Sequence, residues 1–246
     1  MECGKIGDNW YHVDVTWDDP VPDRYGLVQH NNILLSDKAI KKNGHTDWSF
    51  AAESVKCTDS TYDNYFWKNV TSPFVHYDKN WYYMAKNGQK VSLFRTDFNE
   101  ANYMLTEYEE FGHNGCYSGL ALWYGVLVFN TSEHIILYSP HSGNTKIIYD
   151  DMSDNCIYGI MAGDNVSYNL NIAPDMKNQN ILKLDTPIPG DADLNGILNA
   201  KDITILIRHL GGYESNAVSV DVDVDLDGIL SIKDANISRR IVVNKY

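Results

Sequence analysis

Two twelve-residue segments near the C-terminus share one pattern, which restricts what this part of the chain can fold into. They run from Asp191 to Asp202 and from Asp223 to Asp234. Each has oxygen-bearing side chains at positions 1, 3, 5 and 12, a glycine at position 6 and an apolar residue at position 8. This spacing lets a short loop wrap around a hard cation, with a backbone carbonyl offered at position 7. Because the two copies match position by position, they predict two loops that each hold one Ca²⁺ ion.

The predicted ligands are the side chains at positions 1, 3, 5 and 12 and the backbone carbonyl at position 7. In the first loop these are Asp191, Asp193, Asn195, Ile197 and Asp202. In the second loop they are Asp223, Asp225, Asp227, Ile229 and Asp234. The second loop has four carboxylates where the first has three and an amide, and ligand charge tunes calcium affinity. We therefore predict that the second loop binds calcium more tightly.

Each loop is followed by a helix, but the first has none before it. The segment Thr186–Gly190 contains two prolines and a glycine, which break a helix. Apolar residues at helical spacing predict a helix over roughly 200–210 and, less regularly, one over roughly 232–243. Neither helix can bury its apolar face alone, so we expect the two halves to pack together. A unit this small is also expected to need its metal for stability.

These features resemble the dockerin family, type I in the broad sense, over residues from about 188 to 246. The resemblance implies a calcium-folded unit (187–246) that binds a cohesin module of a scaffoldin and so attaches its bearer to a scaffold such as a cellulosome. It places the cohesin contacts at loop positions 10 and 11 and in the helix that follows. The matching residues are Ala200, Lys201, Ile207, Arg208, Ile232, Lys233, Arg239 and Arg240. An ordinary solvated helix surface would explain the basic residues equally well. Because the two halves differ, one docking orientation is expected rather than a symmetric pair.

The segment from Trp10 to Pro20 has a second distinctive pattern. Alternating side chains over residues 10–17 predict a β-strand with two different faces, on which His12 is expected to be an ordinary packed or solvent-facing residue. Burying Asp14 in a strand is costly without partners, and one such partner is a histidine that it orients within a Cys-His-Asp arrangement. The segment resembles the end of a transglutaminase-like (papain-related) domain, here residues 1–50, with further matches at Leu34–Asp37 and Gly44–Trp48. Asp14 matches the catalytic Asp of that family, whose His and Cys would precede Met1, so this chain by itself is not expected to catalyse.

The middle of the chain, residues 51–186, is rich in aromatic and β-branched runs separated by turn residues, which predicts strands. Two units, 81–120 and 126–160, repeat at an offset of about 40 to 44 residues. That period fits one four-stranded propeller blade. There is room for roughly three blades, so the array is open or closes in another way. The predicted fold is thus multidomain: a mainly-β centre of propeller-blade-like repeats followed by a dockerin of two loop–helix (F-hand) motifs.

The four cysteines give no metal-type spacing and are too few for a disulfide framework, so buried thiols are expected. They are Cys3, Cys57, Cys116 and Cys156. The formal net charge of −13 and the lack of a basic run argue against a nucleic-acid partner, and no apolar stretch is long enough for a membrane span.

The leading hypothesis is a calcium-dependent, dockerin-bearing cellulosomal component, extracellular and attached to a scaffold or cell surface although the chain has no signal peptide. One alternative is a fragment of a transglutaminase-like cysteine protease or acyl-transfer enzyme. Another is a glycoside hydrolase active in polysaccharide degradation, which would need two carboxylates positioned in a cleft. Glu107, Glu109 and Glu110 lie close together in sequence and are the candidates for such a pair. Tryptophan and tyrosine side chains in the middle region also make a carbohydrate or cell-wall polymer a candidate partner.

Overall fold

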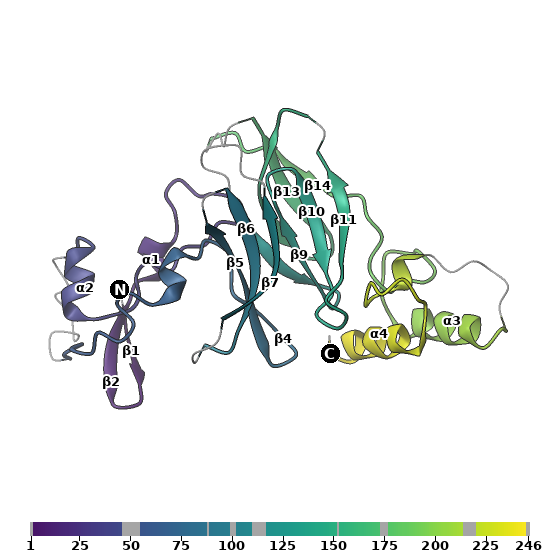
Figure 1. Ribbon diagram of the computed structural model, residues 1–246, viewed down its shortest axis with the longest axis horizontal. Helices are drawn as coiled ribbons and strands as arrows, with labels where there is room; N and C mark the ends of the chain where they lie inside the picture. The colour runs from purple at the N-terminus through teal and green to yellow at the C-terminus, as the bar shows by residue number, and fades with distance from the viewer. Residues whose placement is uncertain are drawn as a thin grey trace.

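The computed structural model describes residues 2–45, 55–87, 89–98, 102–109, 117–151, 153–172, 177–213 and 220–244. This part of the chain is mainly β, with four small antiparallel sheets and few helices. In Figure 1 an N-terminal unit, the central sheets and a C-terminal helical unit follow one another from purple to yellow. The prediction of a mainly-β centre is confirmed. Within the described ranges the sheets form neither a closed barrel nor a closed ring of blades.

The N-terminal unit contains a three-stranded sheet and short helices. Its elements are β1 (Glu2–Ile6), β2 (Asn9–Val13), α1 (Val15–Asp18), β3 (Ile33–Leu35), α2 (Asp37–Lys42) and a 3₁₀-helix (Phe66–Asn69). The prediction of a strand through residue 17 is wrong, because β2 ends at Val13. Asp14 begins α1 instead: its side chain accepts a hydrogen bond from the backbone N–H of Trp17 at 3.2 Å. This N-cap interaction stabilises a helical turn where alternation alone favours a strand.

The centre consists of three sheets, each a meander in chain order. The first contains β4 (Val75–Tyr77), β5 (Asn80–Asn87), β6 (Lys90–Thr96) and β7 (Asn102–Glu109). The second contains β8 (Leu120–Trp123), β9 (Val126–Asn130), β10 (His134–Tyr138) and β11 (Thr145–Asp150), and the third β12 (Cys156–Ala162), β13 (Val166–Asn171) and β14 (Ile181–Lys183). Of the first strands of the three sheets, β8 adjoins both β4 and β12. The predicted repeat matches this order, since its paired segments fall on β5 and β9, β6 and β10, and β7 and β11.

The inner strands β9 and β10 of the second central sheet are buried on both faces. In β9, Leu127 and Phe129 belong to one hydrophobic core, while Val126 and Val128 belong to another. Successive side chains of a strand point to opposite faces, so a strand packed on both sides has apolar residues throughout. Cys156 on β12 is fully buried, as expected. Cys116 lies outside the described residues.

A short segment joins the N-terminal unit to the third central sheet. Tyr25 donates its backbone N–H to Gln179 at 2.9 Å, and its carbonyl accepts a hydrogen bond from the Tyr117 hydroxyl at 3.0 Å. Gly159 on β12 has a φ of +78°, and a Cβ there would lie 2.2 Å from the Tyr25 carbonyl oxygen. Only glycine permits this close approach of the two backbones.

The C-terminal unit contains α3 (Ala200–Leu210) and α4 (Ile232–Asn244), close to the predicted limits, with a 3₁₀-helix at Val220–Val222 between them. The two helices pack together around Leu206 and Ala235, as expected. The unit also shares a second core with the sheets, formed by residues from both. On the helical side this core includes Leu198, Val224 and Ile237.

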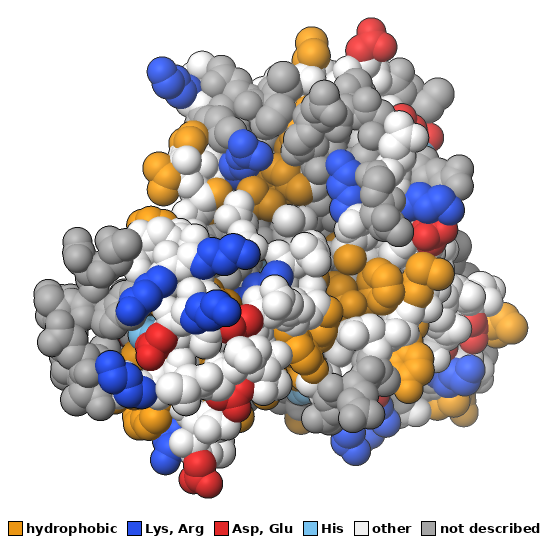
Figure 2. All heavy atoms as spheres, turned by 60° about the vertical axis from the view of Figure 1, so that its left-hand side comes forward, with side chains coloured by type: hydrophobic (Ala, Val, Ile, Leu, Met, Phe, Trp, Pro, Cys, Tyr) orange, Lys and Arg blue, Asp and Glu red, His pale blue; other side chains and the backbone are white. Residues whose placement is uncertain are grey.

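The surface mixes both signs of charge. Figure 2 shows the N-terminal side of the molecule, where lysine and arginine side chains are interspersed with acidic ones and hydrophobic side chains are visible between them. No helix in the described ranges combines the length and apolar character needed to cross a membrane.

Candidate calcium-binding loops

The two predicted loops have the same backbone conformation. At position 4, Leu194 and Leu226 have φ values of +54° and +56°. At position 6, Gly196 and Gly228 have φ values of +81° and +82°. Glycine adopts this left-handed region without steric cost, which explains why position 6 is a glycine in both copies. The duplication in sequence is therefore also a duplication in structure.

The first loop is closed by the carboxylates at its two ends. Asp191 accepts hydrogen bonds from the backbone N–H groups of Asn195 at 3.2 Å and Gly196 at 2.7 Å. Asp202, in the first turn of α3, accepts from Ala192 at 3.0 Å and Asn199 at 2.8 Å. Both aspartates are buried. One carboxylate oxygen from each of Asp191, Asp193 and Asp202 lies within 4.8 Å of the other two.

The second loop repeats this arrangement. Asp223 accepts from the backbone N–H groups of Asp227 at 3.2 Å and Gly228 at 2.8 Å. Asp234, in the first turn of α4, accepts from Val224 at 3.0 Å and Ser231 at 2.9 Å. Oxygens of the side chains at positions 1, 3 and 12 again lie within 4.8 Å of one another; they belong to Asp223, Asp225 and Asp234.

The side chains at position 5 are turned toward their own loops. Asn195 Oδ1 accepts from the backbone N–H of Ile197, and Asp227 Oδ1 accepts from that of Ile229, both at 2.8 Å. The side chains of Ile197 and Ile229 are exposed, so their predicted contribution would come only from the backbone carbonyl. The structure thus brings together the predicted side-chain ligands at positions 1, 3 and 12 of each loop.

Crowded carboxylates raise the energy of both loops. Burial raises the pKa of Asp191, and neighbouring Asp202 and Asp193 add to that shift against the backbone N–H groups that lower it. Burial, followed by the proximity of Asp234, likewise raises the pKa of Asp225. A bound divalent cation would offset this repulsion between ionised groups.

The surroundings of the Asp193 carboxylate show whether the first loop suits a metal ion. Asp193 Oδ2 lies 2.5 Å from Lys201 Nζ, and the hydrogen bond to this lysine lowers the pKa of Asp193. Asp193 Oδ1 is buried and has no hydrogen-bond partner among the described residues. A buried carboxylate oxygen without a partner, in a site where every donor is oxygen, fits Ca²⁺ better than a softer metal.

The residues matched to cohesin contacts are all exposed. They are Ala200, Lys201, Ile207, Arg208, Ile232, Lys233, Arg239 and Arg240. Ile207 and Ile232 are large apolar side chains at 49% and 58% exposure. Lys233 Nζ lies 3.6 Å from Asp227, so both loop lysines face carboxylates of their own loops.

Asp14 has a histidine partner that differs from the expected one. Its Oδ2 lies 3.4 Å from Nδ1 of His45, and both side chains are buried. The ring of His45 packs on Trp17 with a centroid separation of 3.8 Å. His45 follows α2, whereas the histidine implied by the resemblance would precede Met1. Residues 46–48, which completed that resemblance, lie outside the described ranges.

The carboxylates considered for glycoside hydrolysis have other surroundings. Glu107 Oε1 forms an ion pair with Lys90 Nζ at 2.8 Å on the neighbouring strand. Glu109 is the last residue of β7, and Glu110 lies outside the described residues. Glu107 is therefore held in a cross-strand ion pair.

Sequence reasoning missed one cluster, in which Cys3, His12 and Cys57 meet in the N-terminal unit. Their spacing in sequence matches no metal-binding motif. Cys3 and His12 are brought together by the register of the β1–β2 hairpin, in which they are opposite each other. Burial, followed by the proximity of Cys3 and Asp37, raises the pKa of Cys57 to about 12. A thiol in this state is not activated as a nucleophile.

No protein-family model matches this chain, and no curated protein matches it significantly.

Proposed function

We propose that this chain carries a calcium-dependent dockerin that binds a cohesin module of a scaffoldin, as part of an extracellular, cellulosome-type assembly. The observation that carries the proposal is the paired geometry of the loops. Both have the same left-handed positions 4 and 6, and in both a buried aspartate from the following helix closes the loop. The orphaned oxygen of Asp193 supports calcium as the ion.

Calcium would act by fixing where the two helices begin. The ions would be held by the side chains at positions 1, 3, 5 and 12, with the carbonyls of Ile197 and Ile229 as further ligands. Position 12, Asp202 or Asp234, lies in the first turn of α3 or α4. The contact positions 10 and 11 precede it directly, so ordering the loop orders the surface offered to cohesin.

The packing of the two halves supports a single docking orientation. Ile241 on α4 packs against Gly125, where a Cβ would lie 2.7 Å from its Cδ1 atom. Arg240 lines a cavity of about 500 Å³ together with Tyr77 and His141 of the sheets. The α4 half is thus partly occupied by the chain's own sheets, so we assign the main cohesin contact to α3, with Ile207 and Arg208 at its centre.

In this proposal, the dockerin attaches the N-terminal unit and the central sheets to the scaffold. We propose that the three meanders are propeller-blade-like repeats, supported by the contacts of the first strand β8 with both β4 and β12. We propose that residues 1–50 are the end of a transglutaminase-like domain, supported by the burial of Asp14, although its partner His45 is not the histidine that the resemblance implies. Catalysis would need a nucleophile that the resemblance places before Met1.

A pull-down with a panel of cohesin modules tests the proposed function. The full chain should be retained by at least one cohesin in millimolar calcium and released by a chelator. Asp202→Ala should weaken retention, whereas Asp185→Ala, at an exposed position outside the loops, should not. Failure of every cohesin to retain the calcium-loaded chain would refute the assignment.

A further inference from the structure

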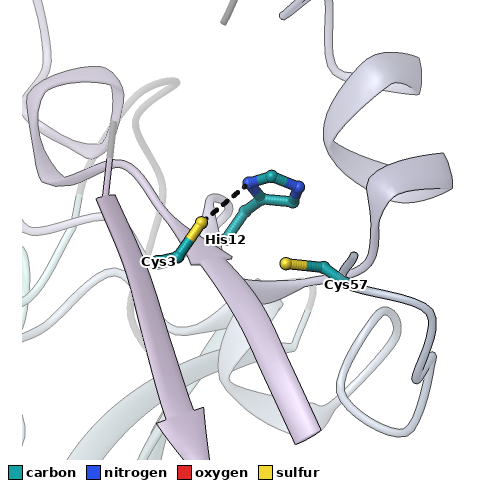
Figure 3. Close-up of side chains that lie close together, drawn as sticks. All are labelled: Cys3, His12 and Cys57. Carbon is teal, nitrogen blue, oxygen red and sulfur yellow. Dashed lines mark hydrogen bonds between the residues drawn. The ribbon is translucent and has the colours of Figure 1, made fainter. Parts of the chain in front are cut away.

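We propose that Cys3, His12 and Cys57 form a binding site for a transition-metal ion, with zinc the preferred occupant. Figure 3 shows the three side chains converging from β1, β2 and the loop that contains Cys57. One ligand atom from each residue lies within 4.8 Å of the other two. This site is independent of the calcium loops, which lie in the C-terminal unit.

The separations suit tetrahedral zinc. With Zn–S and Zn–N bonds of about 2.3 and 2.0–2.1 Å, a tetrahedral ion places sulfur and nitrogen about 3.6 Å apart. Cys3 Sγ lies 3.7 Å from His12 Nδ1. The two residues are opposite each other on antiparallel strands, so the hairpin register holds them on one face. Cys57 Sγ lies within 4.8 Å of both atoms, so the third ligand is also within reach of the ion.

The second nitrogen of the histidine has the partner that metal-bound histidines commonly have. His12 Nε2 lies 2.7 Å from Asp37 Oδ1, and the His12 side chain is fully buried. A carboxylate at Nε2 fixes the ring with its N–H there, which leaves the Nδ1 lone pair directed at Cys3. Asp37 would therefore position the ligand without touching the ion.

The third ligand is held in place by the backbone around it. The carbonyl of Cys57 accepts a hydrogen bond from the Asp37 N–H at 2.8 Å. Farther along the same loop, Asp63 accepts from the backbone N–H and the hydroxyl of Ser36 at 2.8 and 2.7 Å. Asp59 accepts from the side-chain amide of Asn9 at 2.6 Å. These contacts fasten the loop to β2 and to the start of α2, so the site is assembled by the fold.

The donor set decides the class of ion. Two thiolates and an imidazole favour zinc over calcium or magnesium, which prefer oxygen. Binding would displace the thiol protons of Cys3 and Cys57 to solvent. Three protein ligands leave one tetrahedral position for water. A cleft of about 1130 Å³ has Asp37 and Cys57 in its wall and offers an access path.

The experiment uses the full chain in excess calcium, so that the C-terminal loops are saturated before zinc is added. Bound zinc is measured by elemental analysis after dialysis, and cobalt substitution is followed by absorption spectroscopy. We expect about one zinc per chain and, with cobalt, thiolate charge-transfer bands together with the intense visible bands of a tetrahedral ion. Cys3→Ser and Cys57→Ser should each lower zinc affinity at least tenfold. Asp37→Asn should lower it about 10- to 100-fold while the cobalt bands remain.

Cys156→Ser is the matched control, because Cys156 is also a fully buried cysteine but lies on β12. It should retain zinc. Near-ultraviolet circular dichroism of the metal-free variants reports whether the aromatic side chains of each are packed as in the unmodified chain, and the cobalt spectrum of the unmodified chain needs no variant. The proposal is overturned if that spectrum lacks thiolate bands, if peptide mapping of freshly purified protein finds a Cys3–Cys57 disulfide, or if Cys57→Ser binds zinc as tightly as the control.

Discussion

Replacing Asp234 tests whether the aspartate at position 12 holds its loop together even without metal. Its side chain is fully buried, and its two oxygens accept four hydrogen bonds, of which the shortest come from the backbone N–H groups of Val224 and Ser231. Hydrogen bonds to a charged group contribute about 1.5–3 kcal/mol each, so the loss of the two shortest bonds in Asp234→Ala should lower the free energy of unfolding by about 3–6 kcal/mol in chelator. Asp234→Asn keeps one acceptor oxygen and should lose about half as much.

The assay is urea unfolding of the full chain in excess chelator, with hydrogen exchange followed in peptides from residues 224–244. The core that the C-terminal unit shares with the sheets is expected to keep this unit folded without metal, which a separate unit of its size would not be. A loss of 3 kcal/mol corresponds to exchange that is about 100-fold faster in these peptides. Asp185→Ala is the control, because its side chain is exposed and lies outside both loops. If Asp234→Ala changed the free energy of unfolding by less than about 1 kcal/mol, the aspartate would be a metal ligand only, and the structural reasoning would be wrong.

Three further outcomes are expected. Gly159→Ala should lower the free energy of unfolding by about 1–3 kcal/mol in chemical unfolding, because Gly159 has a positive φ and the new Cβ would meet the Tyr25 carbonyl. Gly163→Ala is the control and should be nearly neutral, because no atom lies within 4 Å of a Cβ added there. Equal losses for the two substitutions would contradict this reasoning. Burial lowers the pKa of Lys68 from 10.5 to about 8, so Lys68 loses its proton at a lower pH in the folded state than in the unfolded state. The free energy of unfolding of the unmodified chain, measured relative to that of Lys68→Met, should therefore rise between pH 8 and 10. A difference between the two proteins that stays constant over this range would contradict the prediction. Asn195→Asp gives the first loop a fourth carboxylate and should bring its calcium affinity in titration calorimetry closer to that of the second loop, whereas weaker binding would show that ligand charge does not set the order.

The features predicted well from sequence are those whose determinants are local. The glycine at loop position 6, the aspartate at position 12 and the helix that follows it lie within a few residues of one another, so the pattern contained the geometry. The meanders were also predictable in order, because each strand of the repeat pairs with its neighbour in sequence.

The features that sequence missed depend on competition or on distant contacts. Alternation through residue 17 favoured a strand, but Asp14 caps a helical turn there and ends β2 at Val13. The two halves of the C-terminal unit were expected to bury their apolar faces on each other, yet Val224 and Ile237 share a core with Trp123 on β8. The Cys3–His12–Cys57 cluster forms because the loop that contains Cys57 packs against the β1–β2 hairpin. The spacing of these three residues in sequence does not predict that contact.

Calorimetric titration of calcium into the metal-free full chain tests the central claim most directly. Two bound ions per chain are predicted, the tighter one being lost on Asp234→Asn and the weaker one on Asp202→Asn. A chain that takes up no calcium at millimolar concentration, or whose binding is unaffected by both substitutions, would contradict the assignment of these loops and of the docking function built on them.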